Sequence, residues 1–339
     1  MIIDLRSDTV TKPTKPMLEA MMSAEVGDDV FSEDPTVNLL QERLANMFGK
    51  PKALFFPSGS MANQTAIKLH TQPGEQVICD KYAHIYNYEA GGASFNSGVS
   101  CKLIDGQRGM FKAEQVLEAI NPSDFYYSKS RLVEIENTTN KGGGACWDFD
   151  EIKKIRNICD EHELGFHLDG ARLWNALVAK NESTEQYSIF DTISVCLSKG
   201  LGCPVGSVLI GDEEIMKNAV RYRKVFGGNM RQVGYLAAAG LYALDNNILR
   251  LKQDHQKAKE IGEVLEKQSF IKKVEPIETN IIIFELNKDV DEKVFLTSLN
   301  EKHIHIISMG GGKLRMVTHL DYSDAMHEFL LKELKKRTF

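Results

Sequence analysis

The sequence predicts an α/β protein, with a three-layer large domain built on a mostly parallel sheet and a smaller C-terminal α+β domain. First, short apolar runs alternate with amphipathic helical patterns between residues 35 and 211, which is typical of parallel strands joined by helices. Second, the pattern changes near Asn247, where a long charged helical stretch begins. Third, the length of 339 residues suffices for two domains.

The first predicted elements are a helix, a strand and a second helix. Asp34-Pro35 supplies a helix N-cap and a first-turn proline, the apolar residues of TVNLLQERLANMF fall on one face, and Gly49 ends the helix. ALFF at 53–56 predicts a short strand. The segment 57–60, PSGS, breaks that strand, and MANQTAIKLH at 61–70 begins the next helix.

Five further apolar runs predict buried strands in the same sheet. They lie at 77–80, 131–136, 166–169, 192–198 and 207–211. The clearest intervening helix is FDEIKKIRNICDEHE, with Gly165 after it. Strands separated by helices in this way form a sheet covered on both faces.

The C-terminal part has a different sequence pattern. We expect a helix over 248–268, strands at 280–286, 305–308 and 313–319, a helix between the first two strands, and a final helix. The predicted organisation is an N-terminal segment at 1–15 near the active site, a large cofactor-binding domain at 16–248 and a small domain at 249–339.

Composition excludes several classes of function. The net charge is −6 and no basic stripe is present, which argues against nucleic acid as a partner. No apolar run reaches the roughly 18 residues of a membrane span, and the start lacks the pattern of a signal peptide, so a cytoplasmic protein is expected. The six cysteines lack CxxC spacing and are expected to be reduced.

Polar residues stand where strands of the sheet are predicted to end, the place where ligands bind in such sheets. The segment Ser58-Gly59-Ser60 could hold an anion at a helix N-terminus, or be a plain turn. Asp169 could serve a ligand or pair with the nearby Arg172. Lys199 could extend its charge to solvent, or be desolvated and form a Schiff base. His84 could be structural or part of the site.

The combination favours one cofactor. A phosphate cradle, a strand-end carboxylate and a strand-end lysine are what pyridoxal 5′-phosphate requires, since the lysine forms the Schiff base and the carboxylate pairs with the pyridinium nitrogen. The competing dinucleotide motif at 200–206 has its third glycine one residue late, and a strand rather than a helix follows. His303 and His305 lack a third ligand, so no metal site is predicted.

Ten segments, in order along almost the whole chain, resemble the low-specificity L-threonine aldolases, which are pyridoxal-phosphate enzymes of fold type I, the aspartate-aminotransferase-like fold. The segments are LRSDTVTKP, GDDVFSEDPTVNLL, FPSGSMANQ, HIYNYE, IENTTN, HLDGARLWNA, LSKGLGCPVGS, GGNMRQVG, TNIIIFEL and LRMVTHLD.

The resemblance implies an activity and an assembly. The activity is reversible retro-aldol cleavage of L-threonine, L-allo-threonine and related L-β-hydroxy-α-amino acids to glycine and an aldehyde. The alternatives are β-elimination or transamination on the same scaffold, or a non-catalytic protein with a decayed site. The implied assembly is a homotetramer, a dimer of dimers with active sites at the interface.

The resemblance also implies roles for individual residues. Lys199 and His84 are the predicted catalytic residues, His84 as a ring stacked on the cofactor and as the candidate base. The residues predicted to bind the cofactor are Gly59, Ser60, Met61, His84, Asp169, Arg172, Lys199, Lys224 and Arg231. Of these, Arg231 and Lys224 would reach a phosphate across a subunit interface. The residues predicted to bind substrate are Ser7, Arg172 and Arg315.

Three positions depart from the family pattern. Thr139 stands where many relatives have a histidine near the substrate's β-hydroxyl, Phe31 where they have tyrosine, and Ser32 where they have glycine. These departures leave open the preferred β-substituent, the threo/erythro preference and the base that acts on the hydroxyl.

Overall fold

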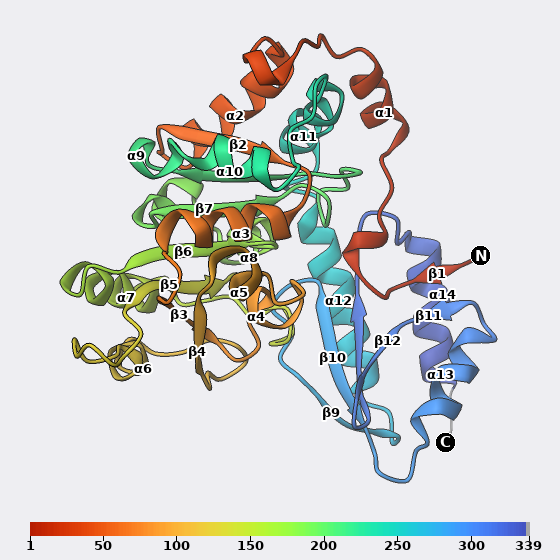
Figure 1. Ribbon diagram of the computed structural model, residues 1–339. Helices are drawn as coiled ribbons and strands as arrows, with labels where there is room; N and C mark the ends of the chain where they lie inside the picture. The colour runs from red at the N-terminus through yellow and green to blue at the C-terminus, as the bar shows by residue number, and fades with distance from the viewer. Residues whose placement is uncertain (337–339) are drawn as a thin grey trace.

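The computed structural model describes residues 1–336, and Figure 1 shows a larger α/β part beside a smaller part that contains the N-terminus and the last described residues. The larger part is built on a seven-stranded sheet. In spatial order its strands are β2 (Lys52–Phe56), β8 (Ser207–Gly211), β7 (Thr192–Cys196), β6 (Gly165–Gly170), β5 (Ser130–Glu136), β3 (Gln76–Asp80) and β4 (Ser100–Ile104). β8 is antiparallel to both neighbours and the remaining pairs are parallel, which confirms the predicted mostly parallel sheet.

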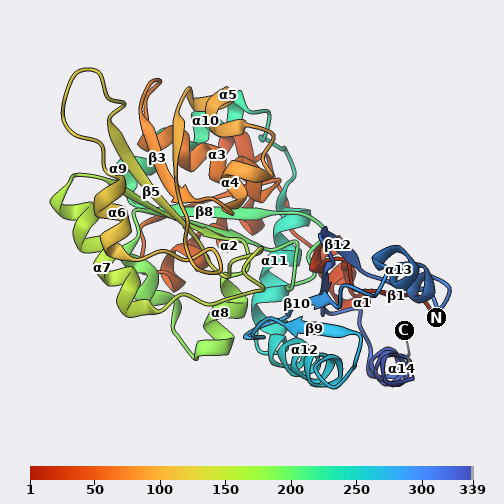
Figure 2. The same cartoon turned by 90° about the horizontal axis from the view of Figure 1, so that it is seen from below.

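Helices cover both faces of this sheet and make the three predicted layers, as Figure 2 shows from below. One face packs against α2 (Pro35–Met47), α6 (Ala113–Ala119), α7 (Phe149–Glu161), α8 (Leu173–Lys180) and α11 (Gly234–Asn246), which in turn packs against α1 (Lys15–Met22). The other face packs against α3 (Gly59–His70), α4 (His84–Asn87), α5 (Gly92–Ser97), α9 (Glu213–Met216) and α10 (Ala219–Val225).

The alternation of residues along the strands decides which face is polar. In β6, Phe166 and Leu168 point into the large apolar core beside α7 and α8, so His167 and Asp169 point to the opposite face. All four side chains are buried. The polar side chains of β6 therefore lie under α3, the helix that begins at the predicted anion cradle.

The smaller part has a four-stranded antiparallel sheet of its own, in the order β12 (Ile307–Gly310), β13 (Lys313–Val317), β10 (Ile281–Leu286) and β9 (Ile271–Val274). Its other elements are α12 (Leu251–Leu265), α13 (Glu292–Asn300), β11 (Ile304–His305) and α14 (Asp324–Lys335). No helix within residues 1–336 combines the length and apolar character needed to cross a bilayer.

The N-terminal segment joins the smaller part. β1 (Ile3–Asp4) pairs in parallel with β11, and the Leu5 carbonyl accepts a hydrogen bond from the Val317 N–H at 2.9 Å. Ile3 and Leu5 are fully buried in the same core as α12 and α14. The chain therefore begins in the smaller part before it enters the larger one.

Candidate active site

A cavity of about 330 Å³ lies beside the carboxyl ends of β6 and β7. Five of the sequence-predicted site residues line it together: Gly59, Ser60, His84, Asp169 and Lys199. They come from four separate segments that are spread along the chain from Gly59 to Lys199, 140 positions later. The structure thus brings together the cradle, the carboxylate, the lysine and the histidine that the sequence predicts for one site.

The cradle is the first turn of α3. The Ser58 hydroxyl accepts a hydrogen bond from the Met61 N–H at 3.2 Å, so the helix begins at Gly59, two residues before the predicted start. A Cβ at Gly59 would lie 2.8 Å from the Cys196 sulfur, so only glycine fits there. The unpaired N–H groups of this first turn and the Ser60 hydroxyl can bind a phosphate.

Lys199 follows the end of β7 and lines the same cavity. Its Nζ lies 3.5 Å from the Cys196 sulfur, and within residues 1–336 it has no carboxylate close enough for an ion pair. The Thr11 hydroxyl donates to the Lys199 carbonyl at 3.2 Å, which ties the N-terminal segment to this position. Lys199 is therefore a side-chain amine without a counter-ion, facing a cavity.

The turn after Lys199 depends on glycine. Gly206 has a φ of +117°, and a Cβ there would lie 2.8 Å from the Phe55 ring. Gly202 has a φ of +78°, in the left-handed region that favours glycine. The backbone can therefore reverse sharply after Lys199 and enter the antiparallel strand β8.

Asp169 is buried and held by two donors. One of its oxygens accepts from the Asn63 side-chain amide at 2.8 Å, and the other from the Ala171 N–H at 2.9 Å. It makes no ion pair with Arg172, so the alternative considered for it from the sequence is wrong. Arg172 instead binds Asp8, 164 residues away in sequence, at 2.8 and 2.7 Å. Asp169 remains available to a ligand in the cavity.

His84 is oriented by Glu89, a residue that the sequence interpretation missed. His84 Nδ1 lies 3.0 Å from Glu89 Oε1, and the same oxygen accepts from the Asn63 amide at 3.0 Å. Burial alone would lower the pKa of His84, but the hydrogen bond to Glu89 and the charge of Asp169 outweigh it and raise that pKa above 6.5. Because Nδ1 is engaged, Nε2 is the nitrogen open to the cavity.

The two arginines predicted to bind substrate differ in their partners. Arg172 is neutralised by Asp8, whose pKa burial would raise but the guanidinium holds at about 2. Arg315 donates to the Asn140 side-chain oxygen at 2.8 Å and to the Arg6 carbonyl at 3.0 Å, and its Nε has no partner among the described residues. Burial, with the nearby charge of Arg172, lowers the pKa of Arg315. Arg315 is thus a guanidinium held by neutral acceptors, which suits it to receive a carboxylate.

The remaining predicted site residues lie outside the cavity lining. Ser7 caps a short helical turn by accepting from the Thr9 N–H at 3.2 Å. Arg231 is exposed and pairs with Asp28 at 2.9 Å, and Lys224 lies in the last turn of α10. The Met61 N–H is taken by the Ser58 hydroxyl, so a role of Met61 in cofactor binding stays a prediction. The roles of Ser7, Lys224 and Arg231 stay predictions, since a role across an interface is not tested by one chain.

Thr139 does not line the cavity. Its side chain is 2% exposed, and its hydroxyl has no hydrogen-bond partner among residues 1–336. It packs against Gly109 and Gly142, where an added Cβ would lie 3.3 Å and 2.2 Å from its atoms. Ser32 adopts a φ of +59°, the conformation that glycine adopts without strain. Phe31 is 69% exposed.

Three buried polar residues of the site were not predicted: Asn63, Glu89 and Glu136. Burial and the charge of Asp169 raise the pKa of Glu136 to about 7, and its Oε1 accepts from the Asn140 N–H at 3.1 Å. Glu136 lies opposite Asp169 in the sheet register. Its position at the end of β5 was a signal for a site residue, because Asp169 ends β6 in the same way.

The ligand atoms of His84, Glu89 and Asp169 lie within 4.8 Å of one another, a spacing that a metal ion could use. However, the Asn63 amide donates to both carboxylates and fills the space between them with N–H groups. This donor set favours a hydrogen-bonded organic group over a cation.

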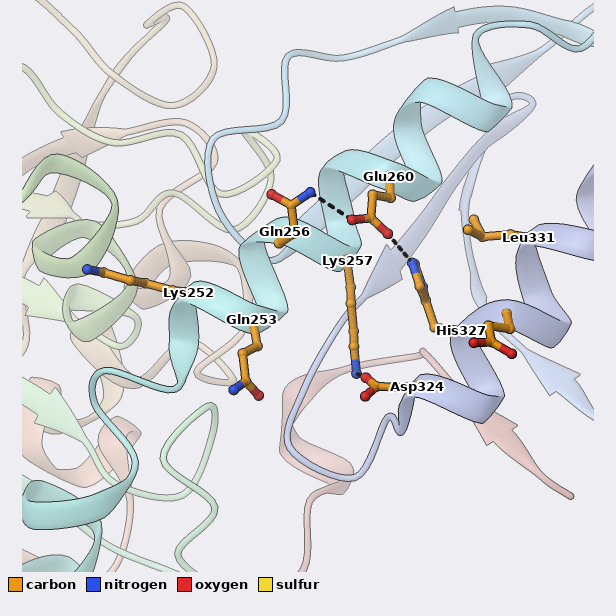
Figure 3. A pocket seen from close by; sticks show the side chains of 9 residues that line it. Lys252, Gln253, Gln256, Lys257, Glu260, Asp324, His327 and Leu331 are labelled. Atoms are coloured by element: carbon orange, nitrogen blue, oxygen red, sulfur yellow. Dashed lines mark hydrogen bonds and ion pairs between the residues drawn. The ribbon is translucent and has the colours of Figure 1, made fainter.

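A second, larger cavity of about 730 Å³ lies between α12 and α14, and Figure 3 shows the side chains that line it. Four of its titratable groups form two pairs: Lys257 Nζ lies 2.7 Å from Asp324 Oδ1, and His327 Nε2 lies 2.7 Å from Glu260 Oε2. None of the sequence-predicted site residues lines it. The smaller cavity is therefore the candidate active site.

The residues of the smaller cavity fit pyridoxal 5′-phosphate. The cradle that a Cβ at Gly59 would fill suits the phosphate, the unpaired amine of Lys199 suits the aldehyde carbon, and the buried carboxylate of Asp169 suits a ring nitrogen that carries a proton. His84 provides a flat ring at the same cavity.

The chain resembles known proteins along almost its whole length. Residues 4–289 match the model of the family described as beta-eliminating lyase. The chain is 41% identical over 324 residues to the low specificity L-threonine aldolase of Escherichia coli K12, covering 95% of each chain. It is 39% identical to low-specificity L-threonine aldolase 1 of Arabidopsis thaliana, over 94% of this chain and 91% of that one.

Solved structures agree with the fold. A threonine aldolase of Leishmania major superposes with a TM-score of 0.86 at 21% identity, covering 98% of this chain and 99% of that one. A serine palmitoyltransferase of Sphingomonas wittichii superposes with a TM-score of 0.74 at 15% identity, covering 98% and 86%. The fold type I architecture that the sequence predicts is confirmed by these neighbours.

Proposed function

Because the chain belongs to the beta-eliminating lyase family and, within it, to the low-specificity L-threonine aldolases, we propose that it cleaves L-threonine, L-allo-threonine and related L-β-hydroxy-α-amino acids to glycine and an aldehyde, with pyridoxal 5′-phosphate as cofactor. The observation that carries the proposal is the convergence of the unpaired Lys199 amine, the buried Asp169 carboxylate and the Gly59 cradle on one cavity.

Pyridoxal 5′-phosphate, when bound, accepts the electron pair that is released when the Cα–Cβ bond of the amino acid breaks. Asp169 receives hydrogen bonds from Asn63 and Ala171 at its two oxygens, which hold the carboxyl group in one orientation at the cavity. The first turn of α3 binds the phosphate through its free N–H groups, and Lys199 supplies the amine that holds the cofactor in place.

Arg315 binds the carboxylate of the substrate. A guanidinium presents two parallel N–H donors to a carboxylate, and Arg315 has no anionic partner within residues 1–336 to displace first. Such a clamp would fix the orientation of the substrate's Cα bonds within the cavity. Orientation of this kind draws on the roughly 7–11 kcal/mol that ideal positioning can supply.

His84 removes the proton of the β-hydroxyl. Its Nδ1 donates to Glu89, so Nε2 carries the lone pair that accepts the proton, directly or through a water. The pKa of His84 is raised, and the neutral ring is the form that acts as a base. The fraction of neutral His84 therefore increases as the pH rises above 6.5. Thr139 does not line the cavity and takes no part as the base.

The wider description of the protein is part of the same proposal. The absence of a second cation in the cavity lining, beside Lys199, within the described residues supports a partner subunit that brings Arg231 or Lys224 to the phosphate. We therefore propose a homotetramer, built as a dimer of dimers and located in the cytoplasm. The division of the chain at 1–15, 16–248 and 249–339 remains a proposal as well.

The decisive experiment maps the cofactor lysine. Borohydride reduction of the purified holoenzyme, digestion and mass spectrometry should place one pyridoxyl group on Lys199. Lys81, a partly exposed lysine paired with Asp105, is the internal control and should stay unlabelled. A pyridoxyl group on another lysine, or none at all, would overturn the assignment.

The reaction itself is tested by its products. The holoenzyme incubated with L-threonine should release glycine and acetaldehyde in equal amounts. Release of a keto acid and ammonia instead would favour β-elimination, the reaction for which the family is named. If neither pair of products is released, the proposed activity is refuted and the protein would only bind the cofactor.

A further inference from the structure

A chain of buried hydrogen bonds runs beneath the cavity, on the sheet face that carries α3. Its members, from the far end to the cavity, are His70, Thr192, His167, Asn63 and Asp169. The four members nearest the cavity are each no more than 2% exposed. The members come from α3, β7 and β6, so the chain connects three elements of the large part.

The carboxylates at the cavity end decide which atom donates and which accepts in each hydrogen bond of this chain. Asp169 and Glu89 can only accept when ionised, so the Asn63 NH₂ group must face them, at 2.8 and 3.0 Å. The Asn63 carbonyl then faces His167 Nε2 at 3.2 Å, and that nitrogen must carry the proton. The Ser194 hydroxyl donates to the same carbonyl at 2.7 Å.

The same reasoning continues to the far end. His167 Nδ1 has no proton in this tautomer, so it accepts from the Thr192 hydroxyl at 2.9 Å. The Thr192 oxygen in turn accepts from His70 Nε2 at 2.9 Å. Burial lowers the pKa of both imidazoles to about 4, so each is neutral and has one defined tautomer at neutral pH.

The opposite tautomer of His167 is disfavoured by one contact. A proton on Nδ1 could reach the Thr192 carbonyl at 3.2 Å, but Nε2 and the Asn63 carbonyl would then face each other as two acceptors. Because both groups are buried, this arrangement would leave two unsatisfied lone pairs. The observed packing therefore selects the Nε2–H form.

Asn63 is the point where the chain divides. Its single NH₂ group donates both to Asp169 and to Glu89 Oε1, the oxygen that also accepts the hydrogen bond from His84 Nδ1. One amide thus contacts the carboxylate proposed to meet the cofactor ring, Asp169, and also Glu89, the partner of the proposed histidine base.

We propose that Asn63 is the positioning residue of this site: its amide, locked by the chain from His70, holds Asp169 as an acceptor for the cofactor and holds Glu89 in place for His84. The proposal rests on the proposed function for the roles of Asp169 and His84. Asn63 itself acts through these residues and not on the substrate.

The first test reads the direction of the chain in the cofactor-free protein. ¹⁵N-histidine NMR should show His167 and His70 as Nε2–H tautomers and, at a pH above the raised pKa of His84, should show His84 with its proton on Nδ1. Signals are assigned with single His→Gln variants. A His167 with its proton on Nδ1 would overturn the proposal, and this reading requires neither activity nor a variant of Asn63.

The second test compares two buried asparagines. Asn63→Ala removes the shared amide, and Asn175→Ala removes an equally buried one that contacts His255 at 2.9 Å and not the chain. In Asn63→Ala, kcat for threonine should fall about 10- to 100-fold, as loss of hydrogen bonds to charged groups implies, with KM changed by less than about threefold.

The pH titration of the cofactor's visible absorbance provides the readout that a general loss of stability would not move. Its midpoint should shift in Asn63→Ala, because Asp169 loses the hydrogen bond that holds its carboxyl group in one orientation beside the ring. In Asn175→Ala the midpoint should match the wild type. Equal midpoints and equal kcat in the two variants would overturn the proposal.

Thr192→Val covers the case in which Asn63→Ala fails to fold. It removes one hydroxyl from a side chain of nearly the same shape and frees His167 to turn its proton to the carbonyl of residue 192. The absorbance midpoint of Thr192→Val should shift in the same direction as that of Asn63→Ala, but by less. An unchanged midpoint would contradict the proposed role of the hydrogen-bond chain. If the wild type does not cleave threonine, the proposed function fails, while the tautomers and the absorbance midpoint still decide the role of Asn63.

Discussion

The pair formed by Asp8 and Arg172 allows a quantitative prediction for the N-terminal segment. Asp8 is fully buried, receives two bonds from the guanidinium at 2.8 and 2.7 Å, and accepts a third from the Asn280 amide at 3.2 Å. Asp8→Asn removes the charge and keeps the shape. Arg172, itself 5% exposed, is then left as a buried cation without a counter-ion.

The expected magnitude follows from the environment of the carboxyl. The fall of the Asp8 pKa from 3.8 to about 2 corresponds to about 2.5 kcal/mol, at 1.36 kcal/mol per pH unit. Breaking a buried pair by removal of one partner costs about 3–5 kcal/mol in other proteins. We therefore expect Asp8→Asn to lower the free energy of unfolding by about 2–4 kcal/mol at neutral pH.

The pH dependence gives the sign of the effect. The folded-state pKa of Asp8 is depressed, so its contribution is fully present above about pH 4 and is lost as the pH falls toward about 2. The difference between wild type and Asp8→Asn should therefore be constant from neutral pH down to about pH 5 and should narrow below about pH 4.

Urea unfolding of the cofactor-free protein, followed by the fluorescence of the buried Trp147 and Trp174, measures this difference at each pH. Asp4→Asn is the matched control from the same segment, since Asp4 pairs with the exposed Arg6, and it should cost less than about 1 kcal/mol. A difference for Asp8→Asn below about 0.5 kcal/mol at neutral pH, or one that does not narrow in acid, would refute the reasoning.

Two further predictions concern the reaction. Arg315→Ala should keep the visible absorbance of the bound cofactor while kcat/KM for threonine falls about 100- to 1000-fold, because a guanidinium–carboxylate clamp is lost; loss of the cofactor would remove Arg315 from the carboxylate role. His84→Asn should lower kcat by about 100-fold. It should also abolish the rise of activity with pH that a base with a pKa above 6.5 produces, and unchanged cleavage would exclude His84 as the base.

The sequence predicts best what depends on local pattern. Six of the seven strands of the large sheet follow from apolar runs, and Asp169 and Lys199 were found because each ends such a run. The short strand β4 was missed, since its residues SCKLI interleave polar and apolar side chains and three of the five are exposed. β1 was missed because two residues become a strand only by pairing with β11.

The partners of the site residues depend on contacts between distant segments, and no local pattern reports them. From the sequence, Asp169 was a candidate ion-pair partner for Arg172 because the two lie close along the chain. In the folded protein Arg172 pairs with Asp8 instead. Asn63 reads as an ordinary helical residue, and its role appears only when α3 lies over β6 and brings its amide to Asp169. Glu89 likewise contacts His84 only because α4 is a single short turn.

The pairing of β1 with β11 has a consequence for the order of assembly during synthesis. Ile3 and Asp4 are synthesised about 300 residues before their strand partners, Ile304 and His305. They therefore stay unpaired until the second strand has been made. Asp8 and Thr11 follow directly and contact Arg172 and Lys199. In a nascent chain that still lacks Ile304 and His305, the segment carrying Asp8 and Thr11 would thus not yet be anchored in the smaller part.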